Sequence, residues 1–281
     1  MKIIESLLRG VGQVMFQNNI WSGLLFLVGI CYNSWQFGLA AFLGTLVSTI
    51  AAIVFRYSKE DISQGIYGFN GTLAGLAVVC FFGVSFISVL SLLVAAVLST
   101  VSMHYLKRIL PPLTAPFVLV TWFCILLLVF IVEYPLLSSG SPVVPQFHLQ
   151  SAFGKSFGQV MFQENTVTGI IFMLAIFINS KLNAAYAVYA AVLGTLTGWL
   201  LQEPLTSLNA GLLGYNAILC AIALSGKKWA DFWWITAAII LSTLLNSVLA
   251  KTGIITLTAP FVIATWLILF LKKRKYFLLK A

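Results

Sequence analysis

Apolar residues occur along this chain in continuous runs that short polar breaks separate. Runs such as ISVLSLLVAAVLSTVSM (87–103) do not alternate with polar positions, as the strands of a transmembrane β-barrel do. They predict membrane-spanning α-helices, because a helix satisfies its own backbone hydrogen bonds in lipid. The first part of the chain contains five such runs, at 20–32, 37–55, 72–83, 84–103 and 115–132.

Four polar motifs occur twice along the chain, in the same order. Residues 12–23 (GQVMFQNNIWSG) and 158–169 (GQVMFQENTVTG) are identical at eight of twelve positions. The other pairs are FLGTLVST (42–49) with VLGTLTGW (192–199), YGFNGTLAGLAV (67–78) with LGYNAILCAIAL (213–224), and LPPLTAPFVLVTW (110–122) with IITLTAPFVIATW (254–266). Such internal similarity is typical of membrane transporters that are built from repeats.

We therefore predict an all-α polytopic membrane protein with a first transmembrane repeat at 1–135, a linker at 136–152 and a second repeat at 153–281. Five helices in each repeat make about ten in total, and an odd number of crossings inverts one repeat relative to the other. The run at 72–83 is too short to cross about 30 Å of hydrocarbon. It is expected to be a re-entrant or tilted pore helix beside a central pore.

Composition supports a membrane location. The chain is 60% hydrophobic and 8% charged, whereas a soluble domain is about a quarter charged. The net charge of +9 comes from basic residues at segment ends and in loops, most densely in KKRK (272–275). This distribution follows the positive-inside rule and places both termini in the cytoplasm. It predicts the lipid bilayer as partner and argues against nucleic acid.

Residues for covalent or metal chemistry are not grouped in the sequence. His104 and His148 are isolated, and the four cysteines occur singly in apolar segments without metal-ligand spacing. There is no Ser-His-acid order and no phosphate-binding glycine loop. We therefore expect no enzyme activity, no metal and no cofactor.

The repeated motifs instead bring hydrogen-bonding side chains to membrane depth: Gln13 and Gln159, Asn70 and Asn216, Thr114 and Thr258. Glutamine oxygens accept hydrogen bonds and aromatic rings make flat walls. Gln13 and Phe16 are three residues apart and would share one face of a helix. The residues of the pairs Phe69 and Leu73, and Tyr215 and Leu219, are four apart and would also share a face. Together these residues predict a flat slot with acceptors along one edge.

Each of these residues also has a simpler interpretation. Most of the 22 phenylalanines are expected to pack in the interior or face lipid. Thr114 could bond back to its own helix, and Pro116 should interrupt that helix and free a carbonyl. Asn70 and Asn216 are expected to support broken helix ends.

Glu164 is the only acid inside a repeated motif, and the matching position holds the neutral Asn18. It is either a helix N-terminal residue that the macrodipole favours or a charge at the mouth of a pore. A proton-coupled secondary transporter of a small neutral amide or polyol, working through Glu164, is the main alternative to a passive pore. An ammonium or water channel is a further alternative, but the sequence lacks the paired intramembrane histidines expected of the first and the Asn-Pro-Ala boxes expected of the second. A structural membrane subunit would not explain the matched polar motifs.

With these motifs the chain resembles the urea transporter family, whose members work as urea channels. The resemblance covers essentially residues 8–270 and rests on GQVMFQNN and GQVMFQEN, YGFNGTLAG and LGYNAIL, and LPPLTAPF and ITLTAPF. Ile20 and Thr166 stand where the family has a proline after the motif asparagine. The compact termini favour a bacterial member, located in the inner membrane.

The resemblance implies a homotrimer in which each protomer has its own pore for passive, selective permeation of urea. It places Gln13 and Gln159 at the start of two oxygen ladders, and Thr114 and Thr258 at the constricted middle. One vestibule would be lined by Phe16, Phe69 and Leu73. The other would be lined by Val160, Phe162, Tyr215 and Leu219.

Overall fold

The computed structural model describes residues 3–137 and 146–278, which form α-helices joined by short loops, together with one π-helical turn. The first half contains α1 (Ile3–Gln13), α2 (Ile20–Asn33), α3 (Trp35–Val54), α4 (Lys59–Ser63), α5 (Gly68–Phe82), α6 (Phe86–Leu106), α7 (Ala115–Leu126) and the π-helix η1 (Leu127–Ile131). The second half contains α8 (Leu149–Gln159), α9 (Thr166–Asn179), α10 (Lys181–Leu200), α11 (Leu205–Asn209), α12 (Tyr215–Ala223), α13 (Trp229–Lys251) and α14 (Ala259–Leu278). The prediction of an all-α protein is confirmed.

The five apolar runs of the first half correspond to α2, α3, α5, α6 and the pair α7–η1 within a few residues. A polar residue marks the break between α2 and α3. Ser34 adopts an extended conformation, and its side chain accepts a hydrogen bond from the Phe37 amide. An N-cap serine of this kind ends one helix and starts the next at a fixed angle.

The lengths and composition of the helices fit an integral, multi-pass membrane protein. Among the described residues, α3, α6 and α13 are long and apolar enough to cross a bilayer. Shorter apolar helices are α2, α5, α9 and the segment Ala115–Ile131. Large apolar side chains on the outer surface, such as Trp35, Phe86, Phe130 and Trp229, are exposed and suit contact with lipid.

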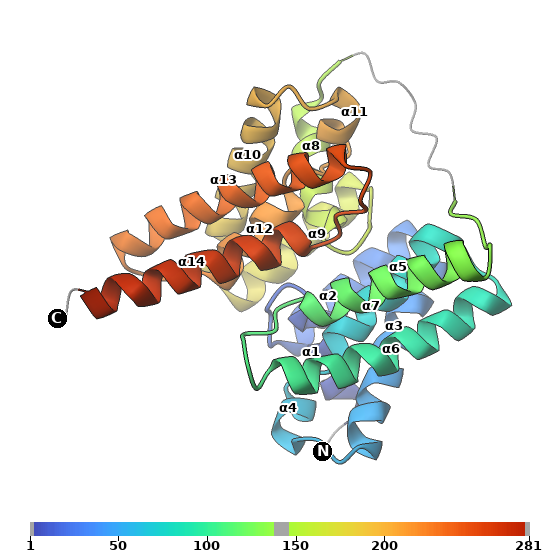
Figure 1. Ribbon diagram of the computed structural model, residues 1–281. Helices are drawn as coiled ribbons and strands as arrows, with labels where there is room; N and C mark the ends of the chain where they lie inside the picture. The colour runs from blue at the N-terminus through green and yellow to red at the C-terminus, as the bar shows by residue number, and fades with distance from the viewer. Residues whose placement is uncertain (1–2, 138–145, 279–281) are drawn as a thin grey trace.

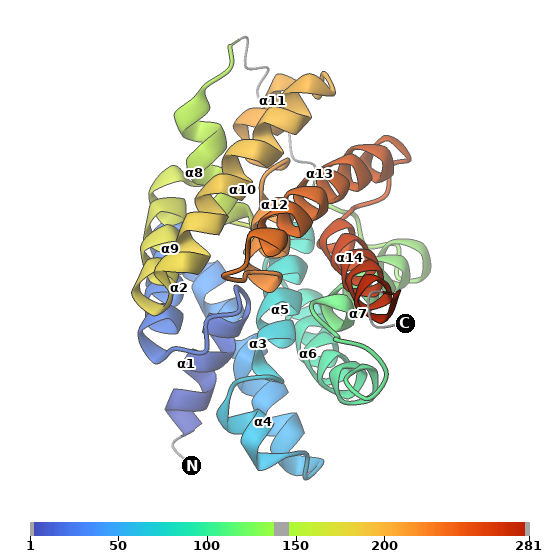
Figure 2. The same cartoon turned by 90° about the vertical axis from the view of Figure 1, so that its left-hand side faces the viewer.

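The two halves meet side by side, principally where α2 packs against α9 (Figures 1 and 2). The Ser22 hydroxyl donates to the Ala175 carbonyl at 2.7 Å, and the Thr168 hydroxyl donates to the Gly29 carbonyl at 3.0 Å. Ser22 and Thr168 occupy the same place in the two copies of the dodecapeptide. The two bonds are therefore reciprocal, which is the signature of a two-fold relation.

A second reciprocal pair lies where α7 and α14 run next to each other (Figure 2). Trp122 donates its indole N–H to the Ile255 carbonyl at 2.8 Å, and Trp266 donates to the Pro111 carbonyl at the same distance. Each tryptophan thus holds the loop that precedes the equivalent helix of the other half. Of the expected linker 136–152, residues 138–145 lie outside the described part of the chain.

Candidate functional site

Each copy of GQVMFQ forms the end of a helix and a tight turn. α1 ends at Gln13 and α8 at Gln159. Phe16 and Phe162 then adopt left-handed backbone angles, with φ of 58° and 60°. The expectation that Gln13 and Phe16 share one helix face is therefore wrong, because the chain reverses between them. A left-handed phenylalanine is strained by about 1–3 kcal/mol. In both copies it is the left-handed residue of a Schellman turn, in which the amide of the following glutamine donates to the carbonyl of the first glycine of the motif.

The first glutamine of the motif is held by its amide nitrogen. Gln13 donates from Nε2 to the Gln64 carbonyl, and Gln159 donates from Nε2 to the Ala210 carbonyl, both at 3.0 Å. These carbonyls lie in the turns that lead into α5 and α12. The structure shows no donor to the side-chain oxygen Oε1 of either glutamine among the described residues, and an amide oxygen can accept hydrogen bonds.

The second glutamine of the motif joins the halves. Gln17 accepts at Oε1 from Asn179 Nδ2 at 2.8 Å, and Gln163 accepts from Asn33 Nδ2 at 2.9 Å. Gln17 and Gln163 are both fully buried. Neither glutamine is predicted from the sequence to have a role, although their identity in the two copies was a signal.

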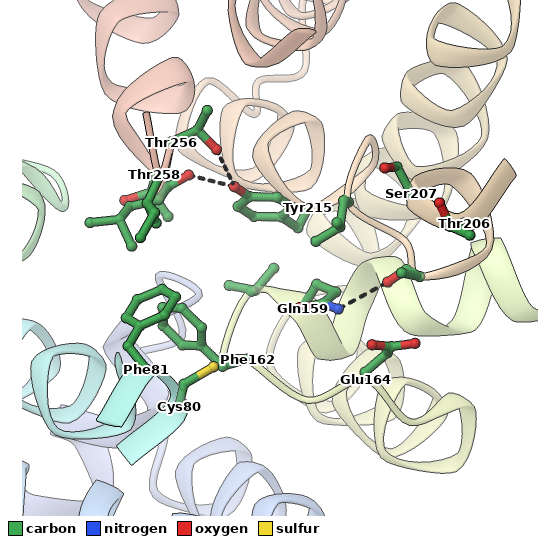
Figure 3. A pocket seen from close by; sticks show the side chains of 15 residues that line it. Cys80, Phe81, Gln159, Phe162, Glu164, Thr206, Ser207, Tyr215, Thr256 and Thr258 are labelled. Carbon is green, nitrogen blue, oxygen red and sulfur yellow. Dashed lines mark hydrogen bonds between the residues drawn. The ribbon is translucent and has the colours of Figure 1, made fainter. Parts of the chain in front are cut away.

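A cavity of 330 Å³ lies beside this turn in the second half. Figure 3 shows it between the end of α8, the start of α12, the loop before α14 and the end of α5. Its lining consists of Cys80, Phe81, Gln159, Val160, Phe162, Glu164, Thr206, Ser207, Ala210, Leu212, Tyr215, Ile255, Thr256, Leu257 and Thr258.

The walls of this cavity are aromatic on one side and oxygen-bearing on the other (Figure 3). Phe162 packs edge-to-face on Phe81 at a centroid distance of 5.8 Å. Hydroxyls of Thr256 and Thr258 come from the loop before α14. The cavity therefore combines flat apolar surfaces with hydrogen-bonding groups along an edge.

The two central threonines contact each other across the halves. Thr114 Oγ1 and Thr258 Oγ1 are 2.6 Å apart, and both residues are buried. Thr114 therefore hydrogen-bonds across the halves, not back to its own helix. The preceding residues Leu113 and Leu257 have left-handed φ of 49° and 47°, so that the chain turns sharply just before each threonine.

The proline after Thr114 starts α7 and does not interrupt it. α7 begins at Ala115, and Pro116 lies in its first turn. A helix tolerates proline there because the first N–H groups have no intrahelical partner. The expectation that Pro116 frees a carbonyl inside a helix is therefore wrong.

Two asparagines satisfy other N–H groups of these first turns. Asn70 Oδ1 accepts from the Phe117 amide at 3.1 Å, and Asn216 Oδ1 accepts from the Phe261 amide at 3.3 Å. Asn70 and Asn216 lie on α5 and α12, so each caps a helix far away in sequence. This agrees with the expectation that they support helix ends.

Glu164 lies at the rim of the cavity, where it pairs with a lysine. Its carboxylate is 2.9 Å from Lys155 Nζ, and its side chain is 54% exposed. The first half has a neutral counterpart, in which Arg9 donates to Asn18 Oδ1 at 2.8 Å. A cation on the first helix of each half thus binds the matching position of the dodecapeptide.

Comparison with known proteins agrees with this geometry. The statistical model of the family described as "Urea transporter" matches residues 4–273. The chain belongs to the urea transporter family. It is 28% identical to "Urea transporter 1" of Rattus norvegicus over 83% of this chain and 65% of that protein. It is also 28% identical to "Urea transporter 1" of Ovis aries, over 96% of this chain and 77% of that protein.

Membership in the urea transporter family makes the chain a transporter and not an enzyme. It spans about two thirds of the length of the rat relative and about three quarters of the sheep relative. Like the chain's own repeat, the family match includes both halves and all the motifs described above.

The cavity gathers six of the residues that the sequence singled out: Gln159, Val160, Phe162, Glu164, Tyr215 and Thr258. Leu219 is fully buried and does not line it. Gln13, Phe16, Phe69 and Leu73 occupy the equivalent positions of the first half, and Phe16 packs on Phe261 at 5.9 Å.

Several lining residues were missed by the sequence analysis. Thr256 and Leu257 directly precede Thr258 in a repeated motif, which was a usable signal. Cys80, Phe81, Thr206 and Ser207 belong to segments that carry no shared motif, and only folding brings them to the cavity.

Proposed function

We propose that the protein is a channel-type transporter for passive, selective permeation of urea and small analogues. The observation that carries this proposal is a single cavity lined both by the rings of Phe81 and Phe162 and by the polar side chains of Gln159, Thr256 and Thr258. The related "Urea transporter 1" proteins support urea as the solute.

Urea is planar, with four N–H bonds and one carbonyl oxygen, so its recognition requires a flat slot with acceptors along an edge. Each hydrogen bond to water that is lost without replacement costs about 1–3 kcal/mol. Gln159 Oε1 and the hydroxyl of Thr258 supply replacements in the second half. Gln13 and Thr114 supply them in the first. One vestibule is lined by Phe16 and Phe69 and the other by Val160, Phe162 and Tyr215, while Leu73 and Leu219 are fully buried.

The same lining excludes ions. Apolar walls cannot replace the water that a charged solute loses. This uncompensated loss of hydration costs about 3 kcal/mol or more. Permeation of a neutral solute then follows its own gradient, and no second solute is needed.

A proton-coupled carrier that works through Glu164 is the second candidate. Coupling uses an acid that is shielded in the membrane interior, whereas Glu164 is exposed and paired with Lys155. This geometry favours a role for Glu164 at the mouth of the pore.

The test is urea flux into proteoliposomes, measured by stopped-flow light scattering with and without a pH gradient. Wild type should conduct urea equally in both conditions. Gln159→Leu should reduce urea permeability about tenfold, because one acceptor bond of about 1.4 kcal/mol is lost. Gln150→Leu on the same helix α8, at an exposed position, is the matched control and should leave it unchanged.

Glu164→Gln separates the two candidates. A passive pore keeps urea flux within about twofold of wild type, since a screened surface charge contributes little. Flux that requires a proton gradient and is abolished in Glu164→Gln would replace the passive mechanism by coupled transport.

The proposal extends to the assembly and its location. We propose a homotrimer with one pore per protomer, embedded in the lipid bilayer of a bacterial inner membrane with both termini in the cytoplasm. The exposed apolar outer surface and the basic residues at segment ends support it. Native mass spectrometry of the detergent-solubilised protein should give three chains, and a cysteine placed at either terminus should react only from the cytoplasmic side.

A further inference from the structure

The two halves differ in the residue that faces the loop before the last helix. In the second half, the Tyr215 hydroxyl donates to the Leu257 carbonyl at 2.5 Å, much closer than the second donor to that oxygen, Asn216 Nδ2 at 3.4 Å. The equivalent pair in the first half is Phe69 and Leu113, where the ring has no hydroxyl. Within residues 3–137 and 146–278, the structure shows no donor to the Leu113 carbonyl.

The neighbours of the tyrosine are polar, which keeps its hydroxyl in place. Tyr215 Oη is 3.3 Å from Thr256 Oγ1. That hydroxyl donates in turn to Asn246 Oδ1 at 2.8 Å, and Asn246 Nδ2 donates to the Leu212 carbonyl at 3.1 Å. The proton of Tyr215 is directed to the Leu257 carbonyl, because a carbonyl oxygen can only accept and this contact of 2.5 Å is much shorter than the 3.3 Å contact with Thr256.

The first half has apolar residues in the same places. Pro112 stands where the second half has Thr256, and Met103 stands where it has Asn246. Asn70 Nδ2 there contacts the Met103 sulfur at 3.6 Å. The difference between the halves thus involves three neighbouring positions and is not limited to one hydroxyl group.

Both partners of the tyrosine bond line the cavity (Figure 3). We propose that Tyr215 is a specificity-determining residue, which masks the Leu257 carbonyl and so removes one acceptor from the second half of the pathway. This inference rests on the proposed function. A solute must displace the tyrosine proton before its own N–H can bind Leu257, whereas the Leu113 carbonyl has no donor among the described residues that would have to be displaced.

The consequence is a lower preference for solutes with many N–H groups. Urea has four N–H bonds and 1,3-dimethylurea has two, so urea gains more from an additional acceptor. Masking the Leu257 carbonyl therefore reduces the ratio of urea to dimethylurea permeability in the wild type.

The test is Tyr215→Phe, assayed in proteoliposomes with urea and with 1,3-dimethylurea well below saturation. Urea permeability should rise about 2- to 10-fold, the range that corresponds to one net hydrogen bond. Dimethylurea permeability should rise less. If the missing oxygen atom acted only by widening the slot, the bulkier dimethylurea would gain as much as urea or more, and that result would overturn the inference.

Phe69→Tyr makes the opposite change in the first half. It tests the inference even if the Tyr215→Phe variant does not fold. Its new hydroxyl is placed to mask the Leu113 carbonyl, so urea permeability should fall and dimethylurea permeability should fall less. An unchanged urea permeability in Phe69→Tyr contradicts the inference. If the wild type conducts urea and the urea permeability of Tyr215→Phe is no higher, only this inference is overturned. If the wild type does not conduct urea, the proposed function itself is overturned.

Discussion

Individual residues of the repeated dodecapeptide have separate tasks. Gln13 bonds to the turn before α5 and presents its oxygen, while Gln17 accepts from Asn179 of the other half. Asn19 accepts from the Trp21 and Ser22 amides and so begins α2. The same tasks recur in the second copy, where Asn165 accepts from the Thr168 amide. An asparagine N-cap fixes the start of the helix in both halves.

The contact between Thr114 and Thr258 predicts that replacing both threonines restores stability relative to a single replacement but does not restore transport. Thr114→Val leaves the buried Thr258 hydroxyl without its partner, which should cost about 1–3 kcal/mol. The double variant with Thr258→Val should recover most of that loss, since two apolar groups of the same shape replace the pair. Its urea permeability should nevertheless fall about tenfold, because the pathway has lost both hydroxyls.

Thermal unfolding in detergent and stopped-flow urea flux provide the two measurements. A double variant that is less stable than either single variant would contradict the proposed pairing. Normal flux in the double variant would remove both threonines from the pathway.

At the scale of elements, α7 and α14 are the helices that deliver the loops with the oxygens. Their first turns are satisfied by the side chains of Asn70 and Asn216, which lie on α5 and α12. In each half, the loop before the last helix is therefore held in place by an asparagine of the short helix, α5 or α12. The left-handed residues Leu113 and Leu257 can be maintained because these contacts hold both sides of the turn.

Asn216→Ala tests the remote cap. It removes the acceptor of the Phe261 amide, and a lost N-cap costs about 0.5–2 kcal/mol. Urea permeability should fall as well, because Thr258 is then less well positioned. Asn18→Ala is the control, since Asn18 is exposed and its replacement should change stability by no more than about 0.5 kcal/mol. Equal stability of the two variants would refute the capping role.

The whole molecule is organised by reciprocal contacts between its halves. Hydrogen bonds from Ser22, Thr168, Trp122 and Trp266 all reach carbonyls of the other half. Gln17 and Gln163 complete the set with side-chain bonds to Asn179 and Asn33. The pathway residues lie close to these contacts, so the geometry of the slot depends on how the halves are joined.

The equivalence of the two glutamine–asparagine contacts predicts equal losses of stability when either glutamine is replaced. Gln17→Met and Gln163→Met each remove the hydrogen bond between a buried glutamine and an exposed asparagine of the other half, at a net cost of about 0.5–1.5 kcal/mol. Because the environments are equivalent, the two losses should agree within about 0.5 kcal/mol, the usual error of additivity. Thermal unfolding of both variants measures this, and a large inequality between them would speak against the two-fold arrangement.

The sequence by itself determined the helical class, the apolar segments, the repeated motifs and most of the polar residues at the cavity. These properties follow from hydropathy and from internal similarity, both of which are local in the chain or visible by comparing its halves. Gln159, Tyr215 and Thr258 could be identified in this way because they stand in motifs that occur twice.

Only the tertiary structure decided what these residues touch. The reversal at Phe16, the start of α7 beside Pro116 and the capping of α14 by Asn216 depend on backbone angles and on contacts between distant segments. The masking of the Leu257 carbonyl by Tyr215 is of the same kind, because the two residues are 42 positions apart. Residues distant in sequence come to share a hydrogen bond only after the helices have packed, and hydrophobic periodicity carries no information about that partner.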